Sequence, residues 1–393
     1  MTTTAQKIRS YRGPAILSYG FRPFFLFAAA WSATAVALWL PLLTGSLYLP
    51  TALDPIQWHT HDLIFGYVPA VIAGFLLTAV PNWTGRLPVA GGPLLTLFLV
   101  WACGRLAVLC SAWIGLRLAA CIDLFFLIAL ATIIARELVA GGNTRNAGVL
   151  ALVGLLLIAN MLSYAEIFFS FGHGLGNRLG IAVILVLIIL IGGRIIPSFT
   201  RNWLMRHAPG RMPAPFGSFD VATMVASSMA LATWVMFPEG QATALLGLIA
   251  CALNTIRLHR WAGARTVAEP LVLILHVAYA FVPLGFFLLP LGINWPEIVS
   301  PTGALHAWTI GAIGIMTLAV MTRASLGHTG RPLTASRPIQ FIYVAALIAV
   351  LARLVAAFGL LREPMLHLSA SAWVLAFTGF VIVYAPLLTR SRS

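Results

Sequence analysis

Acidic residues are scarce in this chain of 393 residues, which contains 10 Asp and Glu against 24 Lys and Arg. Charged residues make up 9% of the sequence and hydrophobic residues 60%, and the mean hydropathy is +0.96. Soluble domains contain about a quarter charged residues, so this composition excludes an ordinary soluble domain. The net charge of +14 would suggest nucleic acid in a soluble protein. Here most arginines fall in short loops between apolar runs, and we expect no nucleic-acid partner.

Cysteine is also rare, and Cys103, Cys110, Cys121 and Cys251 form no CxxC pair. Their positions inside apolar runs exclude a disulfide framework and a zinc knuckle, and we expect four inert core residues. The sequence also lacks a P-loop, a dinucleotide fingerprint, an ordered Ser-His-Asp set and a CxxCH haem attachment motif. Any haem is therefore expected to bind non-covalently.

Long hydrophobic runs are frequent, and they show no strand-like alternation. Runs of about 20 residues are helices in a bilayer, where a helix satisfies its own backbone. The sequence therefore predicts an all-α polytopic transmembrane bundle of about twelve helices, forming one domain over residues 1–393 in contact with membrane lipid. The predicted spans cover about 20–42, 57–80, 93–112, 116–139, 146–170, 176–196, 218–237, 241–258, 268–289, 302–322, 338–359 and 367–388.

Basic residues are unevenly distributed over the two sides of these spans. Of the 24 Lys and Arg residues, nineteen fall on the side of the N-terminus and three on the opposite side, while Arg105 and Arg353 lie inside spans. Loops rich in Lys and Arg stay in the cytoplasm, so both termini are predicted to be cytoplasmic.

Residues 58–69 open the second predicted span and place His59, His61 and Asp62 in a segment that should lie in lipid. An ionisable side chain at that depth costs about 2 to 4 kcal/mol on insertion scales, so it normally faces a partner, a proton path or a metal. From the helical rise, His61 and His306 should lie level with each other, near the outer surface. His59 and His61 point about 200° apart on a regular helix, so they cannot both ligate one ion.

The other ionisable residues inside spans fall in the middle or outer part of the predicted bundle. Arg105 and Arg353 are expected to pair with haem propionates or with Asp123 and Glu166, since an unpaired charge at this depth is costly. His276 lies deeper, in the ninth span. A polar cavity that opens toward the outer half would explain these positions together.

Neutral imidazole is the commonest protein ligand of haem iron and of copper. Any one of these histidines alone is more simply a hydrogen-bonded core residue. Several in a bundle with so few other polar groups favour metal or haem ligation by His59, His61, His276 and His306. His328, in a predicted cytoplasmic loop, is interpreted as a solvated residue, a ligand of a second site or an anion contact.

Glycines follow the histidine of the tenth span. Gly311 and Gly314 lie after His306 and would leave room either for a flat ligand or for a closely packed helix. A weak internal echo also links this span to the second: residues 74–80 (GFLLTAV) resemble residues 314–320 (GIMTLAV). The end of the sixth span, residues 194–203, resembles residues 81–86, so three stacked units of four helices are one interpretation.

With these residues in view, the chain resembles the NnrS family over nearly its whole length. The segments that carry the resemblance are residues 20–25 (GFRPFF), 58–62 (WHTHD), 84–86 (TGR), 194–197 (RIIP), 275–279 (LHVAY), 304–306 (ALH) and 321–331 (MTRASLGHTGR). The resemblance implies a twelve-helix protein of the bacterial inner membrane that contains haem and copper and is linked to nitric oxide stress. One departure is Asp62 and Leu63, where the family is expected to have Glu-Met, so no methionine ligand is available there.

A second resemblance is to the catalytic subunit of haem-copper oxidases, which also has twelve helices. That subunit holds its low-spin haem between histidines of its second and tenth helices, which correspond to His61 and His306. It implies His61 and His306 as an axial pair. The adjacent His-His pair of that family's copper centre is absent, which argues against oxygen or nitric oxide reductase activity.

Together these features predict a haem- and copper-binding inner-membrane protein that protects against nitric oxide. It would bind or convert nitric oxide at the metal, or support metal-dependent respiration; enzymatic turnover is left open. His61, His306, Arg105 and Arg353 are the predicted haem contacts, and copper would use His59, His276 or His328. The alternative is a secondary transporter, favoured by prolines inside spans and by buried His, Asp and Arg residues, although no convincing inverted repeat is found.

Overall fold

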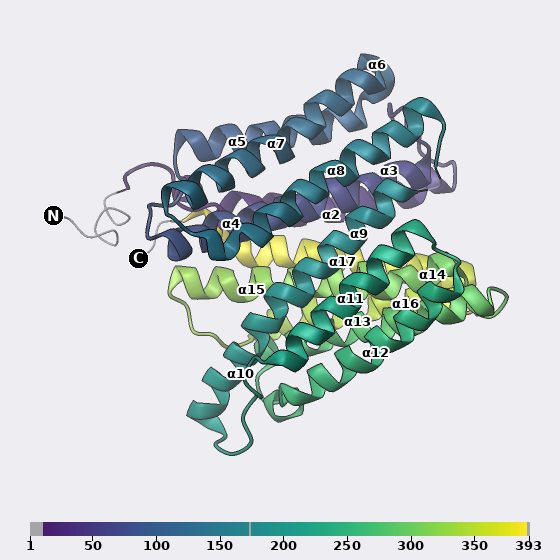
Figure 1. Ribbon diagram of the computed structural model, residues 1–393. Helices are drawn as coiled ribbons and strands as arrows, with labels where there is room; N and C mark the ends of the chain where they lie inside the picture. The colour runs from purple at the N-terminus through teal and green to yellow at the C-terminus, as the bar shows by residue number, and fades with distance from the viewer. Residues whose placement is uncertain (1–10, 173, 391–393) are drawn as a thin grey trace. The chain divides into compact units, whose positions relative to one another are not determined.

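The computed structural model describes residues 11–172 and 174–390, and this part of the chain is helical without strands (Figure 1). Twelve of its helices are long and apolar enough to cross a membrane, which confirms the predicted all-α polytopic class. Nine spans are essentially single helices: α2 (Phe21–Leu43), α5 (Gly92–Leu109), α7 (Leu116–Ala140), α8 (Ala147–Phe169), α11 (Ser218–Met236), α12 (Gln241–Arg260), α13 (Pro270–Asn294), α16 (Arg337–Ala357) and α17 (Arg362–Thr389).

The other three spans are composite, because a π-helical segment interrupts each of them. The second span consists of α3 (Pro55–His61), a π segment (Asp62–Tyr67) and α4 (Val68–Thr84). The sixth consists of α9 (Leu175–Leu187), a π segment (Ile188–Gly192) and α10 (Gly193–His207). The tenth consists of α14 (Pro301–His306), a π segment (Ala307–Ile315) and α15 (Met316–Thr329).

These π segments occur in the same three spans that share the internal echo, four helices apart in sequence. His61 and His306 are each the last residue before a π segment. π segments are rare, and they occur frequently at functional sites because they break the regular backbone ladder. The weak echo in the sequence is thus accompanied by a π segment in each of the three spans.

Two predicted spans are too short. The sixth extends past residue 196 to His207, and the tenth past residue 322 to Thr329. Beyond Pro197 the helix α10 continues as a polar segment that buries only one side, through Thr200 and Leu204. Its other side is polar, so the apolar run ends before the helix does. For the same reason His328 lies in the last turn of α15, and its placement in a loop was wrong.

The start of α3 is set locally by the residues that precede the histidines. Asp54 accepts hydrogen bonds from the backbone N–H groups of Ile56 and Gln57, both at 2.9 Å, and the Gln57 side chain accepts from Asp54 N. Pro55 occupies the first helical position. This capping box fixes where the helix begins and therefore which direction His59 and His61 take.

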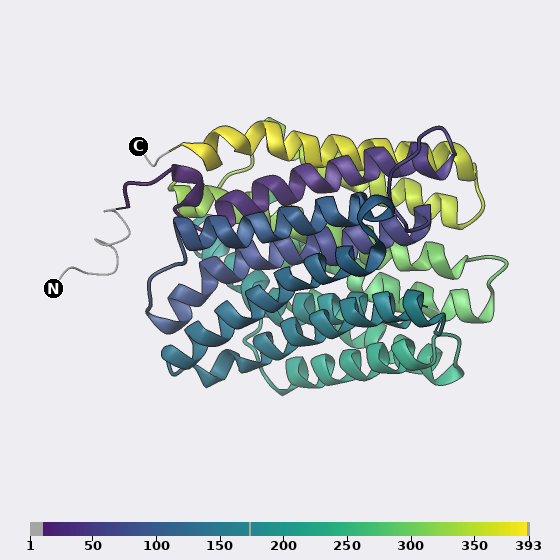
Figure 2. The ribbon, with the colours of Figure 1, turned by 90° about the horizontal axis from the view of Figure 1, so that it is seen from above.

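The chain divides into two compact units. Unit 1 comprises Met1–Gly180, Gly327–Arg331 and Phe380–Ser393, and unit 2 comprises Ile181–Leu326 and Pro332–Gly379. In unit 1, α5 and α8 pack on α7, and α2 packs on α4 (Figures 1 and 2). In unit 2, α12 packs between α11 and α13, and α14 packs on α13 and α16. The single domain predicted from the sequence stays a prediction.

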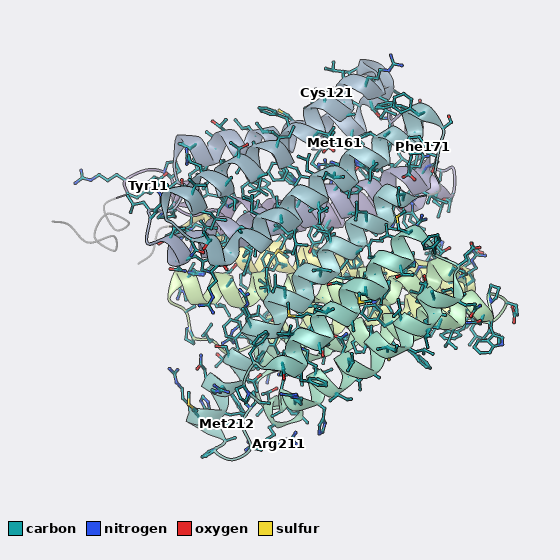
Figure 3. The ribbon with its side chains drawn as sticks, viewed as in Figure 1. Tyr11, Cys121, Met161, Phe171, Arg211 and Met212 are labelled. Carbon is teal, nitrogen blue, oxygen red and sulfur yellow. The ribbon has the colours of Figure 1, made fainter. Side chains whose placement is uncertain are left out.

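The four cysteines are not core residues, which corrects the expectation from the sequence. Cys103 and Cys121 are exposed, Cys110 and Cys251 are partly exposed, and all four are free thiols. The side chains of Cys121 and Met161 are both exposed on the surface of unit 1 (Figure 3). A thiol is weakly polar, so an apolar run does not tell whether it faces lipid or protein.

Candidate functional site

Arg105 on α5 is the centre of a buried ion network in unit 1. Its guanidinium donates from Nη1 to Asp62 Oδ1 at 2.7 Å and from Nη2 to Asp123 Oδ1 on α7. All three residues are at most 3% exposed. Two carboxylates around one guanidinium satisfy its charge within the protein. The expected pairing of Arg105 with Asp123 is confirmed, and Asp62 is a second partner that was not predicted.

His61 joins this network through one ring nitrogen. Its Nε2 lies 3.1 Å from Asn160 Oδ1 and 3.4 Å from Asp123 Oδ2. Asn160 uses its Nδ2 to donate to Asp123 Oδ2 at 2.9 Å, which leaves Asn160 Oδ1 as an acceptor. The His61 hydrogen is therefore on Nε2 and the lone pair on Nδ1. That Nδ1 is buried and has no hydrogen-bond partner among residues 11–172 and 174–390.

The π segment of the second span brings its backbone against Arg105. A Cβ atom on Gly66 would collide with Arg105 Nη1, so only glycine leaves space for the guanidinium. The Gly66 carbonyl accepts a hydrogen bond from Trp101 Nε1 at 2.9 Å. The absence of a side chain at Gly66 therefore allows the Arg105 guanidinium to lie against the backbone of the π segment.

A Gly66→Ala variant is expected to destabilise unit 1 by about 1 to 3 kcal/mol, because the added methyl group overpacks the site and displaces Arg105. Thermal unfolding in detergent measures the effect. Gly148→Ala is the matched control, since a Cβ at Gly148 would meet no atom within 4 Å. Equal midpoints for Gly66→Ala and the wild type would show that the guanidinium does not need this glycine.

His59 and His61 face different helices, as their spacing predicts. The His59 ring stacks on Trp39 of α2, with ring centroids 4.0 Å apart and an angle of 22°. The His61 ring lies 4.9 Å from that of Tyr164 on α8. The two histidines therefore cannot share one ion from this helix.

His276 on α13 has a similar arrangement in unit 2. Its Nε2 lies 2.7 Å from Thr200 Oγ1, and the Thr200 hydroxyl donates to Ile196 O at 2.9 Å. The hydroxyl oxygen is then the acceptor, so His276 carries its hydrogen on Nε2. Its Nδ1 is buried without a partner in the described chain, and it faces Gly263, where a Cβ would collide with it. The His276 ring thus packs directly against the backbone of Gly263.

Unit 2 contains a buried ion pair that the sequence does not predict. Arg257, which is 0% exposed, donates from Nε to Asp220 Oδ1 at 2.9 Å. Its Nη1 donates to Ile189 O in the π segment of the sixth span at 3.0 Å and to Tyr279 OH at 3.2 Å. The sequence signals this pair only through an acidic residue at the start of an apolar run, because Arg257 is one of the nineteen basic residues assigned to the cytoplasmic side.

His306 on α14 and Arg353 on α16 lie at a similar height along these two packed helices of unit 2. The Cβ position of Gly303 on α14 meets Ala357 of α16. His306 follows Gly303 by three residues, and Arg353 precedes Ala357 by four, so each lies about one turn from this contact. His306 Nδ1 donates to Thr302 O at 2.7 Å, which leaves the lone pair on Nε2. No ion pair of Arg353 is found in the part of the chain that the structure describes.

The glycines after His306 are packed against aromatic rings. A Cβ on Gly311 would collide with Phe281, and one on Gly314 would lie 2.5 Å from Trp373. The space beside these two glycines is thus occupied by aromatic side chains of α13 and α17.

Glu166 is not a partner of Arg105 or Arg353. Its Oε1 accepts from Leu175 N at 2.7 Å and its Oε2 from Gly176 N at 3.1 Å. It therefore caps the N-terminus of α9, where a carboxylate satisfies otherwise unpaired N–H groups. The expected pairing of Glu166 with an intramembrane arginine was wrong.

A comparison with known families decides the relationship of the chain. The model of the NnrS protein family matches residues 15–392. The chain belongs to the NnrS family. No curated protein matches it in a comparison of sequences.

In this NnrS family member the predicted ligands are divided between the units. His59, His61 and His328 belong to unit 1, and His276 and His306 to unit 2, so the pairing of His61 with His306 stays a prediction. His328 is exposed, with its ring 5.4 Å from that of Phe21. Over the described ranges, no group of three or more His, Cys, Asp or Glu could hold a metal ion.

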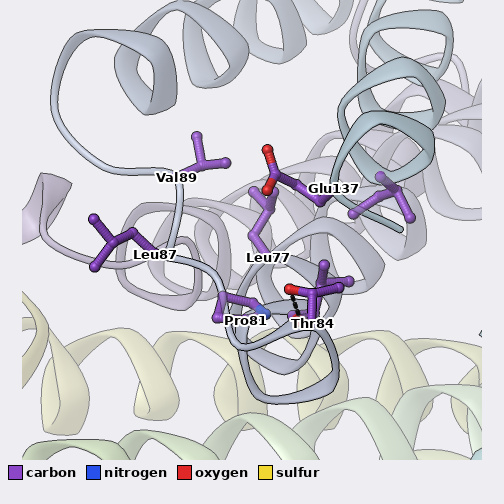
Figure 4. A pocket seen from close by; sticks show the side chains of 8 residues that line it. Leu77, Pro81, Thr84, Leu87, Val89 and Glu137 are labelled. Atoms are coloured by element: carbon purple, nitrogen blue, oxygen red, sulfur yellow. Dashed lines mark hydrogen bonds between the residues drawn. The ribbon is translucent and has the colours of Figure 1, made fainter. Parts of the chain in front are cut away.

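Unit 1 of this NnrS family member also has a small pocket at the end of α4, away from the predicted ligands. It lies between α4 and α7 and contains the carboxylate of Glu137 (Figure 4). This carboxylate pairs with Arg86 at 2.6 Å. The other lining residues are Leu77, Val80, Pro81, Thr84, Leu87, Val89 and Ile134. None of the predicted ligands lines this pocket.

Proposed function

We propose that this NnrS family member is a haem- and copper-binding membrane protein that protects against nitric oxide stress during nitrogen-oxide metabolism. It acts by binding or converting nitric oxide at a metal, or by supporting metal-dependent respiration. The observation that carries the proposal is the pair of buried imidazole nitrogens, His61 Nδ1 and His276 Nδ1, which have no hydrogen-bond partner in the described residues. Buried acceptors are normally satisfied, so each of these atoms is positioned to bind a ligand.

The donor sets fit haem and copper to different degrees. Haem iron needs one or two protein ligands, and His306 supplies an oriented imidazole with Arg353 at a similar level to meet a propionate. Copper favours imidazole, and His61 and His276 each offer one such donor. No group of three or more His, Cys, Asp or Glu among the described residues could hold a metal ion, so these two imidazoles are the donors that would hold copper.

When bound, these groups supply one-electron chemistry and a binding position for nitric oxide. The chain's own residues hold these imidazoles in one orientation, and burial keeps water away from His61 and His276, which are each 5% exposed. Asn160 and Asp123 hold His61, and Thr200 holds His276. Arg105 neutralises carboxylates that would otherwise be buried without a counter-charge.

The location that we propose is the bacterial inner membrane, with both termini in the cytoplasm. The uneven distribution of Lys and Arg over the loops supports this orientation. Fusing a reporter enzyme that folds only in the cytoplasm to residue 390 tests it. Activity of that fusion is expected, and an inactive fusion with an active periplasmic reporter would reverse the topology.

Purified wild-type protein in detergent tests the function. We expect a Soret band in its optical spectrum, and copper together with iron in metal analysis of the same sample. A sample prepared from cells supplied with haem precursor and copper, yet free of both, would contradict the proposal. The transporter alternative, which the buried ion pairs and the intrahelical Pro283 favour, predicts such a sample together with substrate uptake into vesicles.

A further inference from the structure

His61 carries a buried lone pair that unit 1 does not use. Its Nε2–H lies between Asn160 Oδ1 and Asp123 Oδ2, which fixes the ring tautomer. The lone pair is then on Nδ1, which makes no hydrogen bond to any residue that the structure describes. The residue is 5% exposed, so water has little access to it. A buried acceptor left in this state is costly, and a ligand on Nδ1 removes the cost.

The charges around His61 indicate which kind of ligand fits. Asp62 and Asp123 bring two negative charges into the network, and Arg105 brings one positive charge. Within the described residues, the ion pairs of these two carboxylates involve only Arg105 and His61. With a neutral imidazole the network therefore has one excess negative charge. Because an uncompensated buried charge is expensive, a cation on Nδ1 is the ligand that balances it.

Building on the proposed function, we infer that His61 binds copper through Nδ1, and that Asp123 and Asn160 are the residues that position its ring. In metal sites the second ring nitrogen of a histidine donates to a carboxylate or carbonyl, which fixes the ring and makes the ligand more basic. Asp123 and Asn160 contact His61 in this way.

The same geometry disfavours haem iron at His61. Nδ1 is bonded to Cγ, which carries the side-chain stem, so a flat macrocycle bound at Nδ1 would collide with Cβ and the helix backbone. The rings of Tyr164 and Phe65 also flank the imidazole, with centroids 4.9 and 5.5 Å away.

His306 has the opposite arrangement. Its Nδ1 donates to Thr302 O, so the lone pair is on Nε2, the ring nitrogen farthest from the backbone. A macrocycle can approach Nε2 without meeting the stem of its own ligand. Copper is thus assigned to His61 and haem to His306, in place of the shared axial pair expected from the sequence.

Metal analysis of two variants tests this division. His61→Ala is expected to lose most of its copper per protein while the Soret band is largely kept. His306→Ala is expected to lose the Soret band while copper is kept. His61→Gln provides a second test of the same position if the alanine variant gives little folded protein.

The positioning role of Asp123 is tested by comparing Asp123→Asn with Asp62→Asn, since each substitution removes one negative charge from the network. Asp123→Asn is expected to weaken copper binding by about 10- to 100-fold. Pulsed electron paramagnetic resonance of the Cu²⁺ form reports the coupling of the remote imidazole nitrogen, which is expected to change because this nitrogen loses its carboxylate contact. Asp62→Asn should leave that coupling unchanged, since Asp62 does not contact Nε2. Asp220→Asn, in the ion pair of unit 2, is the control for losing a buried aspartate.

The outcomes separate this inference from the function on which it rests. Wild-type protein without haem or copper overturns the proposed function. Wild-type protein with both, combined with full copper retention in His61→Ala and His61→Gln, overturns only the inference. Loss of the Soret band with copper kept in His61→Ala would place His61 at the haem.

Discussion

An Arg105→Gln variant is expected to be destabilised by about 3 to 5 kcal/mol, which is the usual cost of breaking a buried ion pair from one side. Arg105 is 3% exposed and is the cation between Asp62 and Asp123. Without it, two carboxylates stay buried close together without a counter-charge. The expected result is low expression, or an unfolding midpoint far below that of the wild type in the same detergent.

Arg117→Gln is the matched control, because Arg117 lies in the same unit and is exposed. Arg105→Lys should recover little of the loss, since an ammonium group cannot donate to two carboxylates in the geometry of a guanidinium. An Arg105→Gln variant as stable as Arg117→Gln would show that the network does not stabilise unit 1.

Arg257→Met is expected to have an effect of similar size in unit 2, again about 3 to 5 kcal/mol. The substitution leaves Asp220 buried as an unpaired carboxylate and removes the donor to Ile189 O in the π segment. The double variant Arg257→Met with Asp220→Asn should recover part of the loss, because the buried charge is then absent. Unfolding midpoints of the single and double variants measure this coupling.

Arg194→Met serves as the control for Arg257→Met, since Arg194 is exposed in the same unit. If the double variant is no more stable than Arg257→Met alone, the loss comes from packing and not from the unpaired carboxylate.

Most of the fold could be predicted from the sequence because membrane spans depend on long apolar runs, which hydropathy detects directly. All twelve predicted spans are present. The ends of α10 and α15 could not be predicted in this way, because there the helix continues as a segment with polar residues on its outer side. Pro197 does not end α10, since a helix in a packed bundle can accommodate a proline.

The candidate site could be predicted only in part. The depth of Arg105 and Asp123 was sufficient to predict their pairing, because an isolated charge is costly at that position. The role of Asp62 could not be predicted, since it depends on the π segment that begins at this residue. Glu166 is at a similar depth, but the N-terminus of α9 is close enough to satisfy it. Depth therefore indicates that a charge has a partner without indicating which one.

Arg257 shows a different reason for failure. It lies in the last turn of α12 next to His259 and Arg260, so its charge was counted with the loop residues that orient the chain. The structure instead buries it against Asp220. Only the packing of α12 against α11 and α13 distinguishes a buried arginine from its exposed neighbours in sequence.

Titration of the reduced, purified protein with nitric oxide is the measurement that most directly tests whether this NnrS family member binds nitric oxide at a metal. The Soret band is expected to shift as nitric oxide is added, with one spectral change per bound haem, and the shift should be absent in His306→Ala. A haem-loaded wild-type protein whose optical and electron paramagnetic resonance spectra do not change with excess nitric oxide would contradict the account.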